Sequence, residues 1–157
     1  MTAPALGFSG RSIHYNDVPV TNGEPFWPDL NVMEFQQSRT IPPDLPADTA
    51  GRAVLAAVAE INSDLAAVVS AKQAAGYATA LAVPGAKMDG ENQLTAQYKK
   101  AVYARAKADL LGEFPAIGRR ETHPGQESAE TRETLLAEAA LVLRNIKGYP
   151  RAGVYRI

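Results

Sequence analysis

Acidic side chains are the residues of this chain that come closest to a catalytic or metal-binding pattern. Glu60 and Asp64 are four residues apart, so they would share one face of a helix, where two carboxylates could hold a cation. No third ligand is spaced to complete such a site. Asp89-Gly90-Glu91 resembles a fragment of a calcium-binding loop, but the other ligands of that pattern are missing. We therefore expect both groups to be surface or turn residues and predict no metal site.

The residue types used in nucleophilic and metal-assisted catalysis are scarce. The chain has no cysteine and two histidines, and His14 and His123 are too far apart in the sequence to suggest a shared site. The glycine-rich motifs that bind phosphate are absent, since the segment from Gly85 to Lys87 lacks the second glycine and the hydroxyl of such a loop. The nucleophile motif of hydrolases is absent as well. The sequence therefore predicts no catalytic residue, no cofactor and a protein that is not an enzyme.

Basic residues gather in one predicted helix, where Lys99, Lys100 and Lys107 accompany Tyr103. Such a face could contact the DNA backbone or an acidic partner. The net charge of the chain is −1, so there is no overall positive field to attract nucleic acid. Two interpretations stay open: lysines that merely pair with neighbouring acids, or a small helical DNA-binding or regulatory domain that uses the Lys99–Lys107 face.

Length and composition fit one globular domain. The chain has 157 residues, of which 46% are apolar and 21% are charged. No apolar run approaches the roughly 18–20 residues that cross a bilayer, and the first residues lack the basic and apolar regions of a signal peptide. These features favour a soluble protein made inside the cell, without a membrane as partner.

Hydrophobic periodicity and capping residues predict an all-α fold, a small bundle of three main helices preceded by a short leading helix. The expected spans are about 29–38, 48–75, 92–111 and 128–147, and they begin at Asp29, Asp48, Asn92 and Ser128. Gly76 is placed as the residue that ends the second span. Apolar residues in that span recur at spacings of three and four: Val54, Val58, Ile61, Leu65 and Val68.

The ends of the chain differ in composition from this helical domain, which we expect to cover residues 29–148. Residues 1–28 are rich in proline and glycine and predict an extended N-terminal arm, ordered by neighbouring molecules, with few of residues 1–25 touching their own helices. Residues 149–157 predict an extended or β-like C-terminal tail. The aromatic residues Phe26, Trp27 and Phe35, with Met33, either pack in the core or form a partner surface.

The last predicted helix is apolar over more than one face. Leu135 and Val142 fill one stripe, and Leu136 and Leu143 form a second beside it. A small domain buries one such stripe internally, so we expect Leu136 and Leu143 to lie between subunits. Charge is also segregated, with a side-chain sum of +4 in residues 99–120, −4 in residues 121–138 and +4 in residues 144–157. Blocks of opposite sign suit self-association or a charged partner.

Several landmarks occur in a characteristic order along residues 24–157. They are Phe26-Trp-Pro-Asp29, the helix end Ala74-Ala-Gly-Tyr77, the turn Val83-Pro84…Asp89-Gly90-Glu91, the helical segment Tyr98-Lys-Lys-Ala-Val-Tyr103, and Leu143-Arg-Asn-Ile-Lys-Gly-Tyr-Pro-Arg151 before a terminal Ile157. In this order the chain resembles the head completion protein family of contractile-tailed temperate bacteriophages.

The resemblance implies a structural role in the virion. Such proteins are adaptors of the head–tail connector, in which a ring of typically twelve copies attaches under the portal after DNA packaging. The ring holds the packaged genome, which passes through the lumen without specific contacts, and offers a platform for neck and tail proteins. The resemblance implies assembly in the host cytoplasm and neither an enzymatic activity nor a cofactor.

The C-terminal tail is the predicted docking segment. Gly148 and Pro150 release it from the last helix, its apolar residues can serve as anchors, and its arginines suit an acidic surface. With the resemblance, this predicts docking on the portal through Tyr149, Pro150, Arg151, Val154, Tyr155, Arg156 and Ile157. The alternative is a tail that packs back on its own bundle.

Overall fold

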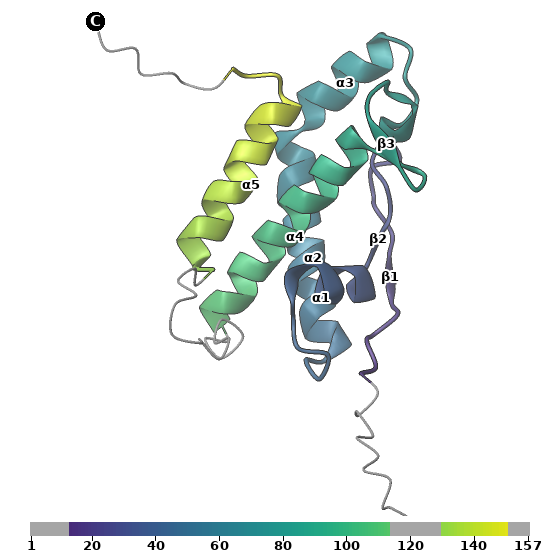
Figure 1. Cartoon of the computed structure of the whole chain (residues 1–157). Coiled ribbons are helices and arrows are strands. Elements are labelled where there is room, and N and C mark those ends of the chain that lie inside the picture. Colours follow the sequence, from purple (N-terminus) through teal and green to yellow (C-terminus); the bar gives the residue numbers. More distant parts are fainter. Residues whose placement is uncertain (1–12, 114–129, 151–157) are drawn as a thin grey trace, which may run out of the picture.

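The computed structural model describes residues 13–113 and 130–150, and this part of the chain is mostly helical. Its α-helices are α1 (Val32–Arg39), α2 (Ala47–Asp64), α3 (Ala66–Ala74), α4 (Gln93–Glu113) and α5 (Arg132–Ile146), with a short 3-10 helix at Ala80–Ala82. In Figure 1, α4 lies in the centre, with α5 on one side and α2 behind it; α2 and α5 run in the same direction and α4 runs opposite to both. The expected all-α class is therefore confirmed in its main feature.

Two small antiparallel ribbons add to the helices. β1 (Pro19–Val20) pairs with β2 (Leu30–Asn31), and β3 (Lys87–Met88) pairs with β4 (Glu91–Asn92). The second ribbon turns through Asp89 and Gly90, whose φ angles of 49° and 78° are those of a two-residue hairpin turn. Asp89-Gly90-Glu91, the fragment of a calcium loop, is thus a hairpin turn that links the 3-10 helix to α4 (Figure 1).

The prediction of a single helix over residues 48–75 is wrong, because the chain bends by 58° between α2 and α3. Leu65 lies at the break with φ −98° and ψ 6°, and its side chain is fully buried. Three residues of modest helix propensity, Asn62, Ser63 and Asp64, precede it. The bend leaves the expected apolar stripe of α2 in the core, but Leu55, next to that stripe, is 53% exposed.

Three helices begin at other residues than the expected caps. α2 begins at Ala47 after the N-cap Pro46, so Asp48, the predicted cap, lies in its first turn. The side chain of Asn31 accepts from the backbone N–H of Met33 at 2.7 Å and caps α1, whereas Asp29 accepts from the backbone N–H of Asn22. Thr131 caps α5 through a reciprocal pair of hydrogen bonds with Thr134. Ser128, the predicted cap, lies outside the described residues. Asp29 cannot cap α1 because its carboxylate accepts from Asn22 of the N-terminal segment, whereas the cap of α5 is a local pair of threonines.

The N-terminal segment from residue 13 onward packs on its own helices, so the expected lack of such contacts is wrong there. Val20 and Asn22 are buried, and Val32 donates its backbone N–H to the carbonyl of Val18. Residues 1–12 lie outside the described residues. The short pairing of β1 with β2 and the burial of Asn22 attach this segment to the bundle.

Aromatic side chains form much of the core. Phe26, Trp27 and Phe35 are at most 3% exposed, so they belong to the core and not to a partner surface. Trp27 stacks on Tyr98 at 4.5 Å between ring centroids, and Phe35 stacks on Tyr103 at 5.4 Å. These pairs join the N-terminal segment and α1 to α4.

No helix in the described ranges is by itself long and apolar enough to cross a membrane. α2 and α3 taken together satisfy the length and composition, but they are separated by the 58° bend.

Candidate interaction surfaces

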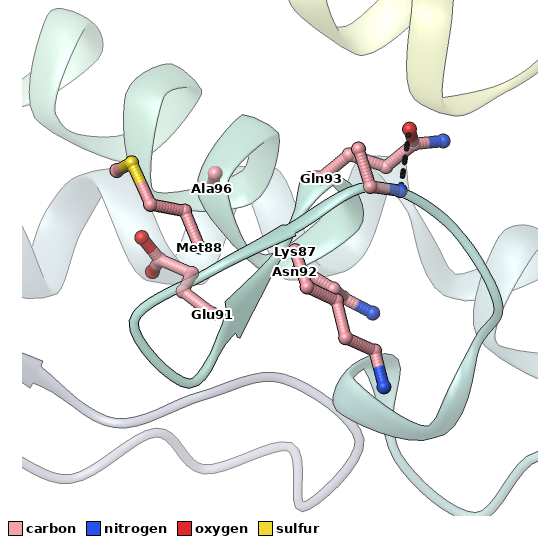
Figure 2. A pocket seen from close by; sticks show the side chains of 7 residues that line it. Lys87, Met88, Glu91, Asn92, Gln93 and Ala96 are labelled. Carbon is pink, nitrogen blue, oxygen red and sulfur yellow. Dashed lines mark hydrogen bonds between the residues drawn. The ribbon is translucent and has the colours of Figure 1, made fainter.

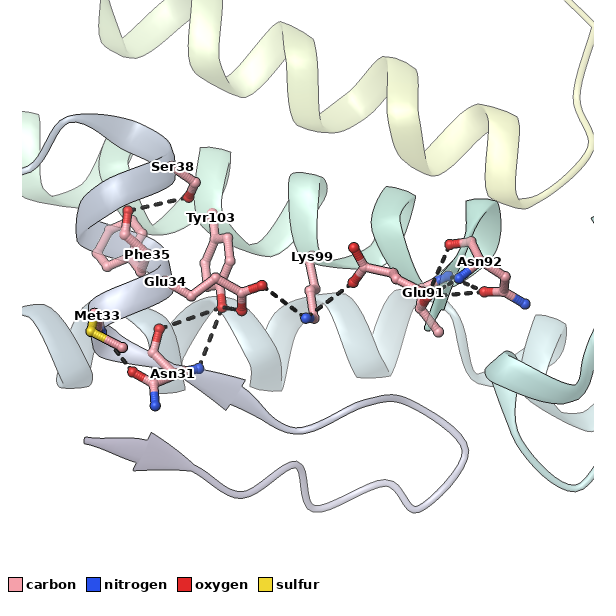
Figure 3. Close-up of polar contacts among 10 residues, drawn as sticks. Asn31, Met33, Glu34, Phe35, Ser38, Glu91, Asn92, Lys99 and Tyr103 are labelled. Carbon is pink, nitrogen blue, oxygen red and sulfur yellow. Dashed lines mark hydrogen bonds and ion pairs between the residues drawn. The ribbon is translucent and has the colours of Figure 1, made fainter. Parts of the chain in front are cut away.

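The lysine face of α4 is largely occupied by the chain's own acids. Lys99 Nζ lies 2.9 Å from Glu34 Oε1 on α1 and 3.0 Å from Glu91 Oε1 on β4 (Figure 3). Burial lowers the pKa of Lys99, but the hydrogen bonds and charges of Glu34 and Glu91 outweigh burial and leave that pKa above its usual value. Lys99 therefore holds α1, α4 and the β3–β4 hairpin together in its charged form.

Tyr103 forms a hydrogen bond with the second carboxylate oxygen of Glu34. Its hydroxyl donates to Glu34 Oε2 at 2.6 Å, beside the backbone of Asn31 (Figure 3). Burial, followed by the hydrogen bond to the Glu34 carboxylate, raises the pKa of Tyr103. The aromatic residue expected among the DNA-contacting lysines thus serves the packing of α1 on α4.

Lys107 is almost completely inside the molecule, at 5% exposure. Its Nζ donates to the backbone carbonyl of Arg39 at 2.6 Å and forms an ion pair with Glu130. Arg39 in turn binds Glu138 with both guanidinium nitrogens, at 2.7 and 3.0 Å. Arg39 lowers the pKa of Glu138 by this hydrogen bonding, against the opposing effect of burial.

Lys100 is the most accessible of the three predicted lysines. Its side chain is 56% exposed, and its Nζ lies 3.9 Å from Glu138. Arg105, on another side of α4, pairs with Glu60 at 2.6 Å. These ion pairs favour the first of the two interpretations, in which the lysines pair with acidic residues of the same chain. They leave the alternative DNA-binding function without the continuous basic face on which it depended.

The paired acids of α2 also have basic partners. Glu60 binds Arg105, and Asp64 binds Lys147, the C-cap residue of α5, at 2.6 Å. Within the described ranges, no three histidine, aspartate or glutamate side chains are grouped so that they could hold a metal ion. Glu60 and Asp64 therefore tie α2 to α4 and α5.

A buried polar cluster that the sequence did not reveal centres on Asn22. Its Nδ2 donates to the hydroxyl of Tyr98 at 2.7 Å, and its Oδ1 accepts from Asn62 at 2.9 Å. The Tyr98 hydroxyl donates to Asn62 Oδ1 at 2.7 Å. Burial raises the pKa of Tyr98 to about 12. Asn22 and Tyr98 are 76 residues apart, and no local pattern signals such a contact.

A second buried amide supports the hairpin. Asn92 Nδ2 donates to the carbonyls of Ala80 and Val83 at 2.8 and 2.9 Å, and its Oδ1 accepts from the backbone N–H of Thr95. Asn92 therefore caps α4, as its position in the sequence predicted, and also anchors the 3-10 helix.

A shallow pocket of about 200 Å³ lies beside the hairpin. In Figure 2, Gln93 lies on one side of the pocket, where its side-chain oxygen accepts from the backbone N–H of Ala86, and Met88 lies on the other side. Met88 is 74% exposed and lies at the outer end of β3. Residues that line the pocket are Ala86, Lys87, Met88, Glu91, Asn92, Gln93 and Ala96.

A larger cleft of about 510 Å³ lies where α2, the end of α4 and the start of α5 meet. Arg52 and Arg132 on its wall are balanced by Asp109 and Glu113. Acids and bases in equal number give the cleft no preference for one charge.

The predicted subunit contact on α5 is partly occupied by the same chain. Leu136 and Leu143 are half-buried and pack against their own core, so a contact of these two residues with another subunit stays a prediction. Leu141, on a different side of α5, is 61% exposed. The accessible apolar face of α5 is therefore centred on Leu141.

The start of the predicted docking tail follows directly from α5. Gly148 has φ 75°, and the backbone N–H of Tyr149 donates to the carbonyl of Arg144, which closes the helix in a glycine C-cap. Tyr149 is 57% exposed and lies under the guanidinium of Arg144, which donates to the Pro150 carbonyl. The other predicted docking residues, Arg151, Val154, Tyr155, Arg156 and Ile157, lie outside the described residues.

The described residues form helices that internal ion pairs join, with small hairpins beside them and no three acidic or histidine side chains grouped to hold a metal ion. Residues 20–157 match the family described as phage head completion protein (GPL), and the chain belongs to this family. The family is one of structural proteins of the phage head, not of enzymes. The resemblance drawn from the ordered landmarks is thereby confirmed.

Two relatives are similar over nearly the whole chain. The probable head completion/stabilization protein of Haemophilus phage HP1 is 36% identical over 148 residues, which cover 94% of this chain and 98% of the relative. The head completion/stabilization protein of Escherichia phage P2 is 26% identical over 145 residues, which cover 90% and 85%. No solved structure matches the chain.

Proposed function

We propose that this chain is an adaptor of the head–tail connector. Twelve copies form a ring under the portal after packaging, retain the genome, let DNA pass through the lumen without specific contacts, and offer the attachment platform for neck and tail proteins. The observation that carries this proposal is the match to head completion/stabilization proteins along nearly the full chain. The protein assembles in the host cytoplasm and stays in the neck of the virion.

The arrangement of charges supports a structural component that does not change shape. Lys99 and Lys107 are paired internally, and Arg39 and Glu138 join α1 to α5. The helices are thereby fixed to one another, which suits a component that must carry load without changing shape. Arg39, Lys99 and Lys107 are thus used inside the subunit, which suits a lumen that the genome passes without specific contacts.

The C-terminal tail is the proposed portal contact. It leaves α5 after Gly148, at a point where Tyr149 is exposed. Residues 151–157 contain two arginines and three apolar anchors, the composition that suits an extended segment on a partly acidic surface. Each main-chain hydrogen bond of such a segment contributes about 1 kcal/mol. Many tails on one portal bind together, so weak single contacts are sufficient.

Deletion of residues 149–157 tests the tail. The truncated chain keeps its helicity and melting temperature, because Tyr149 and Pro150 lie outside the core. Co-sedimentation with the purified portal is lost. Deletion of residues 1–12 is the control, since it shortens the chain by a similar length at the other end, and it keeps portal binding. A tail-deleted protein that still sediments with portal would exclude this contact, and one that unfolds would show that the tail packs on its own bundle.

A further inference from the structure

The end of α5 is closed by two backbone hydrogen bonds around a left-handed glycine. The N–H of Gly148 donates to the carbonyl of Asn145 at 3.0 Å, and the N–H of Tyr149 donates to the carbonyl of Arg144 at 3.0 Å. With φ 75° at Gly148, these two bonds form the Schellman motif. This motif often brings two apolar side chains together across the helix end. Here the corresponding side chains are those of Tyr149 and Arg144.

Arg144 uses its guanidinium group for two contacts beyond the helix. Its Cζ lies 5.9 Å from the centroid of the Tyr149 ring, and its Nη2 donates to the carbonyl of Pro150 at 2.9 Å. A planar guanidinium can lie over a ring with its face while an N–H at its edge reaches an oxygen. Pro150 has a fixed φ and restricts Tyr149 to extended backbone conformations. The path of the chain is therefore defined as far as Pro150.

The last turn of α5 is itself attached to the rest of the bundle. Ile146 is buried in the core, and Nζ of Lys147, the C-cap residue, lies 2.6 Å from Oδ1 of Asp64 in α2. In Figure 1 the segment after α5, drawn in yellow, leads away from the other helices. The direction that Arg144 gives to this segment is thus fixed relative to the whole bundle.

Stability of α5 alone does not account for both contacts of Arg144. A cation near the C-terminus of a helix is favourable wherever its side chain points, because it interacts with the helix dipole. The ring of Tyr149 and the carbonyl of Pro150 lie beyond the helix, and Tyr149 is 57% exposed. Ordering two residues outside the core has a cost in entropy. Such an arrangement is useful where the segment that follows must begin in a set direction.

We propose that Arg144 is a positioning residue for the C-terminal tail. By holding Tyr149 and Pro150, it makes residues 151–157 start from one place and in one direction. The inference rests on the proposed function, in which this tail binds the portal. Residues 151–157 extend at most about 25 Å from Pro150, so the starting direction limits which portal surface they can meet. A segment that is partly ordered before binding also loses less entropy when it binds.

The conservative variant Arg144→Lys tests the positioning role. It keeps the charge but lacks the planar group that contacts the ring and the carbonyl together. We expect the affinity of the full-length chain for purified portal to fall about five- to tenfold, with helicity and melting temperature unchanged. Arg52→Lys is the matched control, since Arg52 is another exposed helical arginine but lies on α2, and it leaves the affinity unchanged.

Insertion of two glycines after Pro150 separates positioning from a direct contact of Arg144 with the portal. The insertion keeps Arg144, Tyr149 and every predicted docking residue, but it loosens the direction of the tail and lowers the affinity by a similar factor. In the inserted chain, Arg144→Lys then has less than about a twofold further effect, because the direction is already lost. Fully multiplicative effects of the two changes would show that Arg144 binds the portal itself, which would overturn the proposal.

Nuclear magnetic resonance of the full-length chain without portal tests the contact directly. We expect nuclear Overhauser effects between the Tyr149 ring and the Arg144 side chain, and their absence would overturn the proposal. A clear fall in the melting temperature of Arg144→Lys would overturn it as well, because the role would then be in the stability of α5.

Failure of this inference and failure of the proposed function give different results. Unchanged portal affinity of Arg144→Lys, together with loss of binding on deletion of residues 149–157, would exclude the positioning role and leave the tail contact standing. Portal binding by the tail-deleted chain would defeat the proposed tail contact, and the positioning role with it.

Discussion

Individual side chains in this protein are explained by partners that lie far away in the sequence. The lysines of α4 look like a basic face when they are read along the helix, but Glu34, Glu91 and Glu130 come from three other segments and neutralise Lys99 and Lys107. A helix pattern shows which residues share a face and cannot show what lies opposite. This is why the lysines could be found from the sequence and their role could not.

Removal of the Tyr98 hydroxyl tests the contribution of the buried polar cluster to stability. Tyr98→Phe leaves Asn22 Nδ2 and Asn62 Oδ1 each without one hydrogen bond inside the protein. We expect a loss of about 1–3 kcal/mol in the free energy of unfolding, measured by urea denaturation. Tyr149→Phe is the matched control, because Tyr149 is 57% exposed, and its effect stays within about 0.5 kcal/mol. Equal effects of the two changes would contradict the cluster.

The Arg39–Glu138 pair predicts a pH dependence. The pKa of Glu138 is lowered in the folded state, so the pair stabilises the fold above the usual value of 4.5 and loses this effect as the pH falls through the lowered pKa. Glu138→Gln costs about 1–2 kcal/mol at pH 7, a range that allows for screening of a partly exposed pair. The difference from the natural chain shrinks as the pH falls through the lowered pKa of Glu138, as thermal unfolding along a series from neutral to strongly acidic pH would show. A constant difference would argue against the pair.

At the scale of elements, the existence of the helices was predictable and their joints were not. The spacing of Val54, Val58 and Ile61 places α2 correctly, because one buried stripe is a local property of the sequence. The break at Leu65 depends on burial of that side chain against other elements, which spacing does not contain. The same holds for the hairpin that Lys99 and Asn92 attach to the bundle.

Two glycines, one inside α2 and one at the end of α3, should respond in opposite ways to substitution by alanine. Gly76 ends α3 with φ +98°, so Gly76→Ala costs about 1–2 kcal/mol of stability. Gly51 lies inside α2, and a methyl group there would meet Val32 at an ordinary contact distance of 3.7 Å. Gly51→Ala therefore stabilises the protein by about 0.5–1 kcal/mol. Melting temperatures of the two variants check this, and a gain from Gly76→Ala would contradict the C-cap.

The molecule as a whole is a bundle fixed by internal ion pairs, with open helix faces on different sides and an exposed start of the C-terminal tail. The family and the mainly helical class could be predicted from ordered landmarks and periodicity, because both are properties of the linear sequence. The attachment of residues 13–28 to the bundle could not, because it depends on Asn22 meeting Tyr98 and Asn62.

The central claim is that copies of this chain form a ring on the portal. Electron microscopy of purified portal, with and without the added protein, tests it most directly. The account predicts an additional ring of density, coaxial with the portal and on its outer side, when the full-length chain is added. A portal that looks the same with and without the added protein would contradict the claim, provided that both proteins are folded and the added protein is in excess over the portal.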